Sequence, residues 1–318
     1  MNINMYDVAI VGGGIVGLAT AYKLQLCFPI FKIVVIEKED SLAFHQTGRN
    51  SGVIHSGLYY KPGSFRAKNC VDGRKQLVDF AKSNSIKYDI CGKIVLAVNN
   101  NEVEYLLKLK KNGEENGLIG LEILSPEEFQ KIEPNAVGVA ALWVPESGII
   151  DYKQTTKKFV EKILAINTQS KIICSCEVID YNDDFLETSN GNIYAKNNIF
   201  CAGLFSDRLA KKDNFKLNMK IVGFRGDYFE LTKKAKSKVN NLIYPVPNAE
   251  FPFLGVHFTR MIDGSVECGP NAVFTFKREG YSKTAFSLRD TLGSLFFKGT
   301  IRLFINHWKF GVNEYRRA

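Results

Sequence analysis

Apolar and polar positions in the first forty residues follow a strand–helix–strand order. The run YDVAIV at 6–11 predicts a buried strand, and apolar residues at helical spacing continue from the following glycines to Leu26. The run KIVVI at 32–36 predicts a second buried strand, and the sequence GGGIVG at 12–17 separates the first strand from the helix. These segments predict one βαβ unit of about 30 residues.

Helical and alternating patterns fill the rest of the chain without an internal repeat. Helices are predicted at 71–84, 102–116 and 155–166, and from Ser125, which precedes a proline and two acids. Strands are predicted at 94–98 and 198–203, in a hairpin of 172–181 and 185–188, and within 221–231, 241–247, 253–259 and 265–270. We therefore expect an α/β protein: a Rossmann-like, three-layer domain with an interleaved α+β domain on an antiparallel or mixed sheet.

Composition and charge narrow the function classes. Of the 318 residues, 45% are hydrophobic and 24% are charged, as in a soluble globular protein, and the net charge is +9. No Lys/Arg block or nucleic-acid motif accompanies this charge, so we expect a basic enzyme that binds no nucleic acid. No apolar run approaches the roughly 18 residues of a membrane-spanning helix, and no targeting segment precedes the first strand, so we expect a cytoplasmic protein.

The cysteines predict neither disulfides nor a metal centre. They are odd in number, seven, and Cys174 and Cys176 form a CxC pair that no second Cys/His pair accompanies. We therefore expect no zinc or other metal. Scattered thiols in a chain of this size are typical of a reducing compartment.

The glycine-rich turn carries the first functional signal. Gly12 permits a tight turn, Gly14 lets the backbone approach a pyrophosphate, and Gly17 lets the helix pack closely on the strand. The helix N-terminus offers free N–H groups and a positive dipole to phosphates. Glu37, followed by Lys38, lies about 20 residues further on, where an acid binds ribose hydroxyls. Because strand, helix and acid are all in place, we expect a dinucleotide rather than a glycine turn without a ligand.

Two further segments indicate which dinucleotide. The sequence VAIVGGGIVGLATA near the N-terminus resembles that of flavoproteins more than that of nicotinamide dehydrogenases. The sequence FCAG, with Cys201, Ala202 and Gly203, resembles the late strand and turn of FAD oxidoreductases that passes the cofactor phosphates. Val178 resembles the backbone position that meets the adenine there, although a core valine is the alternative. The resemblance implies FAD.

A polar ribbon, QTGRNSGVIHSGLYY at 46–60, resembles the segment that runs under the flavin in the glycine/D-amino-acid-oxidase superfamily. The resemblance implies hydrogen bonds or close backbone approach from Thr47, Asn50, Ser51 and Gly52. It also implies that His55 and Tyr60 project toward the flavin and the substrate, with a structural histidine as the alternative for His55. Some relatives attach flavin through a histidine of this ribbon. Arg49 stands at that position here, so we expect non-covalent FAD.

The most specific likeness is to the L-2-hydroxyglutarate oxidase/dehydrogenase family. It rests on GRNSGVIHSGLYYKPGSFRAKNCVDG, LWVPESGIIDY, GFRGDYFEL and above all the run from Leu242 to Tyr281. The resemblance implies FAD-dependent oxidation of L-2-hydroxyglutarate to 2-oxoglutarate by hydride transfer from C2 to flavin N5, with electrons passing to a quinone or another acceptor. The alternatives are a flavin oxidase of another 2-hydroxy acid, an amino acid or glycerol 3-phosphate, and a truncated remnant without catalysis.

This chemistry needs a base for the substrate hydroxyl and partners for a dianion. His257 is our preferred base, since an imidazole titrates near working pH, and His55 is the second candidate. Candidate substrate ligands are Tyr60, Arg225, Tyr244, Arg260 and Asn271. The alternative for each is a structural or surface role.

The likeness also implies a domain plan. We expect an FAD-binding domain of residues 1–80 and 141–215, and a substrate domain of residues 81–140 and 216–318. Family members normally continue past the final NEYRRA with a glycine-rich segment that closes the FAD domain, so we expect a truncated chain with weak FAD retention. The aromatic and basic stretch 287–310 is either a helix pair packed on the substrate domain or a peripheral contact with the inner face of the cytoplasmic membrane.

Overall fold

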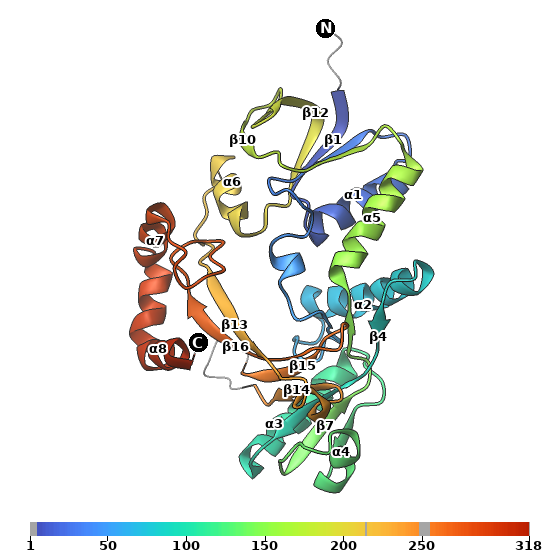
Figure 1. Cartoon of the computed structure of the whole chain (residues 1–318), viewed down its shortest axis with the longest axis vertical. Coiled ribbons are helices and arrows are strands. Elements are labelled where there is room, and N and C mark those ends of the chain that lie inside the picture. Colours follow the sequence, from blue (N-terminus) through green and yellow to red (C-terminus); the bar gives the residue numbers. More distant parts are fainter. Residues whose placement is uncertain (1–4, 214, 248–254, 318) are drawn as a thin grey trace. The chain divides into compact units, whose positions relative to one another are not determined.

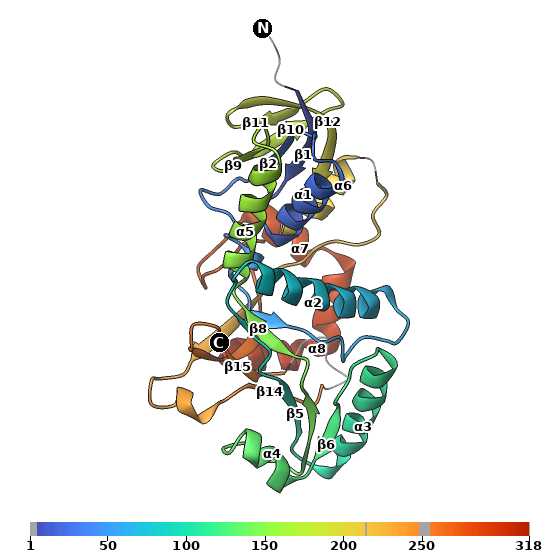
Figure 2. The ribbon, with the colours of Figure 1, turned by 90° about the vertical axis from the view of Figure 1, so that its right-hand side faces the viewer.

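A computed structural model describes residues 5–213, 215–247 and 255–317 (Figures 1 and 2). The chain forms two compact units, each built from two stretches. The first unit comprises Met1–Asn50 and Tyr152–Val222, and the second comprises Ser51–Asp151 and Gly223–Ala318. Residues 51–80 and 141–151, which we expected in the same domain as the N-terminus, belong to the second unit. Their strands β3 (Val53–Ile54) and β8 (Gly148–Ile150) pair with each other there.

The first unit is built on a six-stranded sheet with the order β10-β11-β12-β1-β2-β9. Its strands are β1 (Met5–Val11), β2 (Ile33–Ile36), β9 (Lys171–Ile173), β10 (Val178–Tyr181), β11 (Leu186–Thr188) and β12 (Gly191–Phe200). The strands β12, β1, β2 and β9 run parallel, and β10 and β11 continue the edge antiparallel. Because β2 is buried along its whole length, its IVVI run is uniformly apolar rather than alternating.

Helices cover this sheet and position its turns. They are α1 (Ile15–Cys27), α5 (Tyr152–Ile166) and α6 (Ser206–Lys212), with short 3-10 turns η1 (Gln46–Gly48) and η2 (Gly203–Phe205). Figure 1 shows α1 and α5 packed side by side, and they are in contact. The βαβ unit predicted from the first forty residues is therefore present as β1-α1-β2.

One predicted strand is wrong in its extent. The segment 172–181 forms two strands, of which β9 pairs with β2 and β10 pairs with β11. Ser175 between them has a φ of 51°, a left-handed conformation that cannot continue an extended strand. Its N–H donates to the Glu39 carbonyl at 2.7 Å, so a local turn redirects the chain.

The second unit holds a seven-stranded sheet with the order β13-β16-β15-β14-β5-β7-β6, and a three-stranded sheet with the order β3-β8-β4. The further strands are β4 (Tyr88–Asp89), β5 (Lys93–Ala97), β6 (Glu122–Leu124), β7 (Ala140–Val144), β13 (Phe224–Glu230), β14 (Leu242–Pro245), β15 (His257–Arg260) and β16 (Val266–Phe274). All neighbours in the large sheet are antiparallel except β14 and β5. The expected mixed sheet is therefore present.

The helices of the second unit are α2 (Phe65–Ser83), α3 (Asn100–Glu115), α4 (Pro126–Ile132), α7 (Leu288–Leu295) and α8 (Lys298–Arg317), with a 3-10 turn η3 (Lys236–Lys238). The expected start at Ser125 is a capping box: its hydroxyl accepts from the Glu128 N–H, and the Glu128 carboxylate accepts from the Ser125 N–H. The helices α7 and α8 contact each other, and α8 also lies on β16. None of the helices in the described part of the chain has the length and apolar content of a bilayer span.

Candidate functional site

The glycine turn after β1 is as tight as its sequence predicts. Gly12 has a φ of 118°, and a Cβ there would lie 2.3 Å from the Cys201 carbonyl oxygen. A Cβ on Gly17 would lie 2.0 Å from the Gly12 carbonyl oxygen. The turn, the start of α1 and the chain at Cys201 therefore approach one another too closely for any residue with a side chain.

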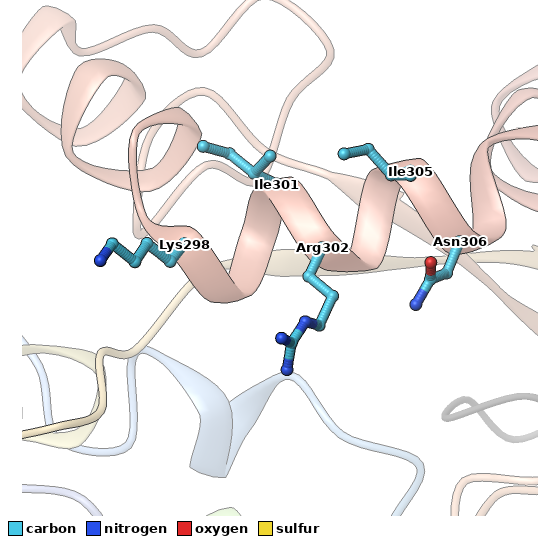
Figure 3. A pocket seen from close by; sticks show the side chains of 5 residues that line it. All are labelled: Lys298, Ile301, Arg302, Ile305 and Asn306. Atoms are coloured by element: carbon cyan, nitrogen blue, oxygen red, sulfur yellow. The ribbon is translucent and has the colours of Figure 1, made fainter.

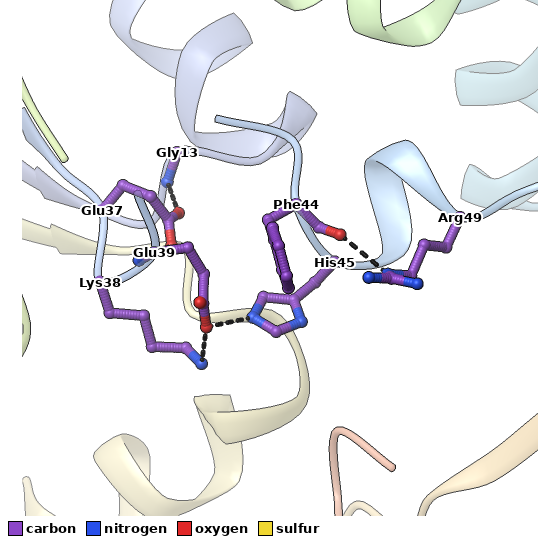
Figure 4. Close-up of polar contacts among 7 residues, drawn as sticks. All are labelled: Gly13, Glu37, Lys38, Glu39, Phe44, His45 and Arg49. Carbon is purple, nitrogen blue, oxygen red and sulfur yellow. Dashed lines mark hydrogen bonds and ion pairs between the residues drawn. The ribbon is translucent and has the colours of Figure 1, made fainter. Parts of the chain in front are cut away.

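Polar contacts fix this turn at the start of α1. The Gly13 N–H donates to Glu37 Oε2 at 2.7 Å (Figure 4), and the Ile15 N–H donates to the Thr47 hydroxyl at 3.0 Å. No side chain caps Gly14, the N-cap of α1, and no acid lies in the first turn of this helix. A helix end with no acid in its first turn and a glycine at its N-cap suits a pyrophosphate. The glycine turn and the start of α1 therefore fit the pyrophosphate of a dinucleotide.

Charged groups beside the turn are already paired (Figure 4). Glu39 accepts from Lys38 Nζ at 2.7 Å and contacts His45 Nε2 at 2.8 Å. Its pKa is lowered, chiefly by the hydrogen bond from Lys38. The Arg49 guanidinium donates through Nε to the Phe44 carbonyl at 3.1 Å, and lies 5.1 Å from the centre of the Phe44 ring. Of these residues the sequence singled out Lys38 and Arg49 but gave no reason to select Glu39 or His45.

The other predicted cofactor residues of the first unit have mixed settings. Asn50 stabilises the 3-10 turn η1, since its Nδ2 donates to the Gln46 and Thr47 carbonyls at 3.1 and 2.7 Å. Ala202 and Gly203 form the turn after β12, in which Gly203 has a φ of 53°. Val178 is partly buried and packs against the core of the sheet.

Ser51 and Gly52 fall in the second unit. Gly52 has a φ of 65°, and its carbonyl accepts from the Ile150 N–H at 2.8 Å. The ribbon 46–60 is thus shared between the two units.

A group of basic and aromatic side chains gathers in the second unit. We name it the basic–aromatic cluster and define it as His55, Tyr59, Lys93, Tyr244 and His257. Strand register explains three members: Leu242 on β14 pairs with Lys93 on one side and with Thr259 on the other. Because alternate residues share a face of a sheet, Lys93, Tyr244 and His257 lie on one face. The Tyr244 and His257 rings are stacked, with centroids 4.1 Å apart.

Two members of this cluster, Tyr59 and Lys93, were missed by sequence reasoning. The Lys93 side chain is only 1% exposed, and its Nζ donates to the Tyr59 hydroxyl at 3.4 Å. Nζ also lies 4.5 Å from the Tyr59 ring centre and 4.9 Å from that of Tyr244. Burial lowers the pKa of Lys93 to about 7. A lysine at the first position of an apolar strand gives no local sign of such burial, because its amine usually reaches solvent.

His257 has the geometry of a proton acceptor. Its Nδ1 lies 2.9 Å from the Gly255 carbonyl, which can only accept, so Nδ1 carries the proton and Nε2 bears the lone pair. The side chain is buried, and this desolvation, with the nearby Lys93 charge, lowers the pKa of His257 although the Gly255 carbonyl opposes the shift. The ring is therefore neutral at neutral pH.

His55 and Tyr60 lie on the ribbon in the same unit. His55 is exposed to solvent, yet the surrounding protein and the positive charges of Lys93 and His257 lower its pKa to about 4. Tyr59 is half-buried, and its pKa is raised, chiefly by burial and to a lesser extent by the nearby Tyr244. Tyr60 is also half-buried, and its carbonyl accepts from Asn116 Nδ2 at 2.9 Å. His55 gives the basic–aromatic cluster a solvent-facing member.

The remaining predicted substrate ligands are engaged differently. Arg225 forms a two-point ion pair with Asp227 at 2.5 and 2.9 Å. Arg260 pairs with Asp89. Asn271 is buried; its Nδ2 donates to the Arg317 carbonyl at 3.4 Å, and its Oδ1 has no hydrogen-bond partner among the described residues. Each arginine therefore already has a carboxylate partner.

A groove of about 410 Å³ lies along α8, a helix distant in sequence from the basic–aromatic cluster. Its lining comes from one helix: Lys298, Ile301, Arg302, Ile305 and Asn306 (Figure 3). This groove contains none of the predicted catalytic or substrate residues.

Comparisons with known proteins identify the family and the relatives that this chain resembles. The family model of FAD dependent oxidoreductases (DAO) matches residues 7–305. The chain is 43% identical to L-2-hydroxyglutarate dehydrogenase of Indibacter alkaliphilus, over 98% of this chain and 79% of the relative. It is 42% identical to L-2-hydroxyglutarate dehydrogenase of Escherichia coli K12, over 99% of this chain and 75% of the relative. The mitochondrial L-2-hydroxyglutarate dehydrogenase of Homo sapiens is 41% identical, over 98% of this chain and 71% of the relative.

Solved structures agree on the fold. L-alpha-glycerophosphate oxidase from Mycoplasma pneumoniae, with FAD bound, superposes with a TM-score of 0.72 at 28% identity, covering 89% of this chain and 76% of that chain. Glycine oxidase from Geobacillus kaustophilus superposes with a TM-score of 0.70 at 17% identity, covering 86% and 73%. At the latter identity the likeness supports the fold alone.

Proposed function

This chain belongs to the FAD-dependent oxidoreductase (DAO) family, and we propose that it oxidises L-2-hydroxyglutarate to 2-oxoglutarate with FAD as cofactor. The observation that carries the proposal is the identity of 41 to 43% with L-2-hydroxyglutarate dehydrogenases, sustained over 98 to 99% of the chain. The α/β fold and the glycine turn are those of an FAD-binding oxidoreductase. The first unit is the proposed FAD-binding domain and the second is the proposed substrate domain.

The residues of the first unit fit FAD. Gly12 and Gly17 let β1, α1 and the chain at Cys201 pack tightly, and Gly14 leaves the backbone at the start of α1 open to a pyrophosphate. The Gly13 N–H holds Glu37 where its carboxylate would accept ribose hydroxyls. Both Glu37 oxygens already accept one backbone N–H, from Gly13 and Glu39, and each retains a lone pair for a ribose. The arginine at position 49 has no imidazole to form a histidyl linkage, which supports the proposal that FAD binds non-covalently.

When bound, FAD supplies the acceptor for the hydride that leaves C2 of the substrate. The protein must take the hydroxyl proton, and His257 is suited to this through the lone pair of Nε2. Stacking on Tyr244 and the hydrogen bond to Gly255 hold the ring in one orientation and one tautomer. His55, also neutral at pH 7, is the alternative base.

The substrate is a dianion, and the basic–aromatic cluster presents amine, imidazole and phenol groups. Tyr60, Tyr244 and Asn271 are proposed hydrogen-bond partners for its oxygens. Arg225 and Arg260 would have to exchange Asp227 and Asp89 for a substrate carboxylate. Their present pairing makes them weaker candidates than the cluster.

The electron acceptor is proposed to be a quinone, reached by peripheral contact with a membrane. This rests on α8, where Ile305, Trp308 and Tyr315 are 60 to 70% exposed. The same helix carries the cations Lys298 and Arg302, which line the groove with Ile305. Sedimentation with vesicles tests it. Binding to vesicles of 30% anionic lipid that Trp308→Ser and Ile305→Ser weaken would support it, and equal recovery in the supernatant with and without vesicles would refute it.

Substrate identity is tested by anaerobic flavin reduction with saturating FAD. L-2-hydroxyglutarate should bleach the flavin at least a hundredfold faster than glycerol 3-phosphate, L-lactate or glycine. Preferential reduction by glycerol 3-phosphate or by an amino acid would move the chain to another activity of the same fold.

A further inference from the structure

Lys93 has no anionic partner among the residues that the structure describes. It is fully buried, and among the described residues no carboxylate forms an ion pair with it. The titratable groups around it are Tyr59 and His55 of the ribbon, Cys70 of α2, Tyr244 of β14 and His257 of β15. Burial raises the pKa of the Cys70 thiol, and none of the others is an anion at neutral pH. A buried amine without a counter-charge is costly to keep.

The surroundings favour a ligand over a structural role. On its face of the sheet, Lys93 lies between Val95, in the core with α3, and Leu242, which packs against Val53 and Ile149. An apolar side chain would fill this position better than an amine does. In the described part of the chain, Nζ contacts the Tyr59 hydroxyl through a long hydrogen bond of 3.4 Å and lies over the rings of Tyr59 and Tyr244. The cluster thus gathers cationic and hydrogen-donating groups whose complement is a carboxylate.

We propose that Lys93 is a substrate-binding residue whose ammonium group pairs with one carboxylate of the dicarboxylate substrate. The inference rests on the proposed function, because that function supplies the dicarboxylate. Solvent-exposed His55 marks the side from which the anion enters, since its ring is close enough to Lys93 for their charges to interact. Tyr59, bound to Nζ through its oxygen, keeps its own O–H proton for donation to the same carboxylate.

Calorimetry with unreactive ligands tests the pairing apart from turnover. Glutarate is titrated into the FAD-saturated chain at pH 8 in two buffers of different ionisation enthalpy, with butyrate as the monocarboxylate probe. The free amine, with a pKa of about 7, is mostly neutral at pH 8, and an adjacent carboxylate restores its charge. Binding should therefore take up close to one proton. His55 and His257 contribute little, because their lowered pKa values keep them neutral at this pH.

Two substitutions separate charge from packing. Lys93→Met should weaken glutarate binding on the order of 30-fold, as expected for a charge-assisted hydrogen bond, and should abolish the proton uptake. Lys93→Arg should keep part of the affinity but also abolish the uptake, since arginine is always protonated. The control Lys108→Met removes the same charge from the exposed face of α3, beside Glu104. It should change neither the glutarate affinity nor the proton uptake.

The outcomes distinguish this inference from the proposed function. If the Lys93→Met variant binds glutarate with unchanged affinity and unchanged proton uptake, the role of Lys93 is overturned and the proposed function stands. Failure of the wild-type chain to bind any dicarboxylate, with flavin reduced by another substrate, would overturn both.

Discussion

Replacing Lys93 by methionine should stabilise the second unit. Folding lowers the pKa of Lys93 from 10.5 to about 7 through burial. At 1.36 kcal/mol for each pKa unit, and with about half of the amine neutral at pH 7, this burial costs about 4 kcal/mol. Methionine has a similar length and no charge. Loss of the contacts with Tyr59 and Tyr244 offsets about 1 kcal/mol, so the expected net gain is about 3 kcal/mol at pH 7.

The gain should depend on pH in a defined direction. Between pH 7 and 10.5 the unfolded chain binds more protons than the folded chain at this lysine, so wild-type stability rises with pH. The cost falls to about 1 kcal/mol at pH 9.5, and the advantage of Lys93→Met should nearly vanish there.

Urea unfolding at pH 7 and pH 9.5, followed by tryptophan fluorescence, measures this difference. Both tryptophans of the chain, Trp143 and Trp308, lie in the second unit, so the signal reports the unit that holds Lys93. Lys108→Met serves as the exposed control and should change the free energy of unfolding by less than about 0.5 kcal/mol at both pH values. A destabilised Lys93→Met variant, or a gain that does not shrink with pH, would refute the account of Lys93 burial.

Other predictions concern the turn, the base and a helix cap. Gly17→Ala puts a methyl group 2.0 Å from the Gly12 carbonyl, so FAD affinity measured by flavin fluorescence should fall at least tenfold. The control Gly73→Ala, in open space on α2, should leave FAD affinity unchanged. Equal effects of the two substitutions would contradict the packing argument. His257→Asn should slow flavin reduction by about 10² to 10⁴ and leave glutarate affinity within about threefold; a loss under tenfold in rate would exclude it as the base. Because burial lowers the pKa of His257 from its usual value, protonation of the imidazole should slow flavin reduction at saturating substrate only at acidic pH. A fall in rate centred above pH 7 would contradict this. Ser125→Ala removes the capping box of α4 and should cost about 1 kcal/mol in urea unfolding followed by Trp143 fluorescence, with no change expected in FAD affinity.

Features that depend on neighbours in sequence were predictable. The turn from Gly12 to Gly17 and the cap at Ser125 each follow from local backbone chemistry, and the structure has both. The segment 172–181 failed for the opposite reason. No glycine or proline marks the break at Ser175, where a left-handed turn bound to the Glu39 carbonyl separates β9, which pairs with β2, from β10, which pairs with β11.

The basic–aromatic cluster was only partly predictable. His55, Tyr244 and His257 stood out because their residue types suit proton transfer and anion binding. Lys93 did not, since its burial arises when β5 is placed between β14 and β7, and β14 lies about 150 residues further along the chain. Conversely, Arg225 has the ideal chemistry for a carboxylate, but the sequence could not reveal that Asp227 already occupies it.

The central claim is tested most directly by the visible spectrum of the FAD-saturated chain, recorded anaerobically before and after addition of L-2-hydroxyglutarate or its D enantiomer. We predict bleaching of the flavin band by the L enantiomer, formation of one 2-oxoglutarate for each flavin reduced, and no bleaching by the D enantiomer. A spectrum that neither enantiomer changes, while another hydroxy acid, an amino acid or glycerol 3-phosphate reduces the flavin, would contradict the account.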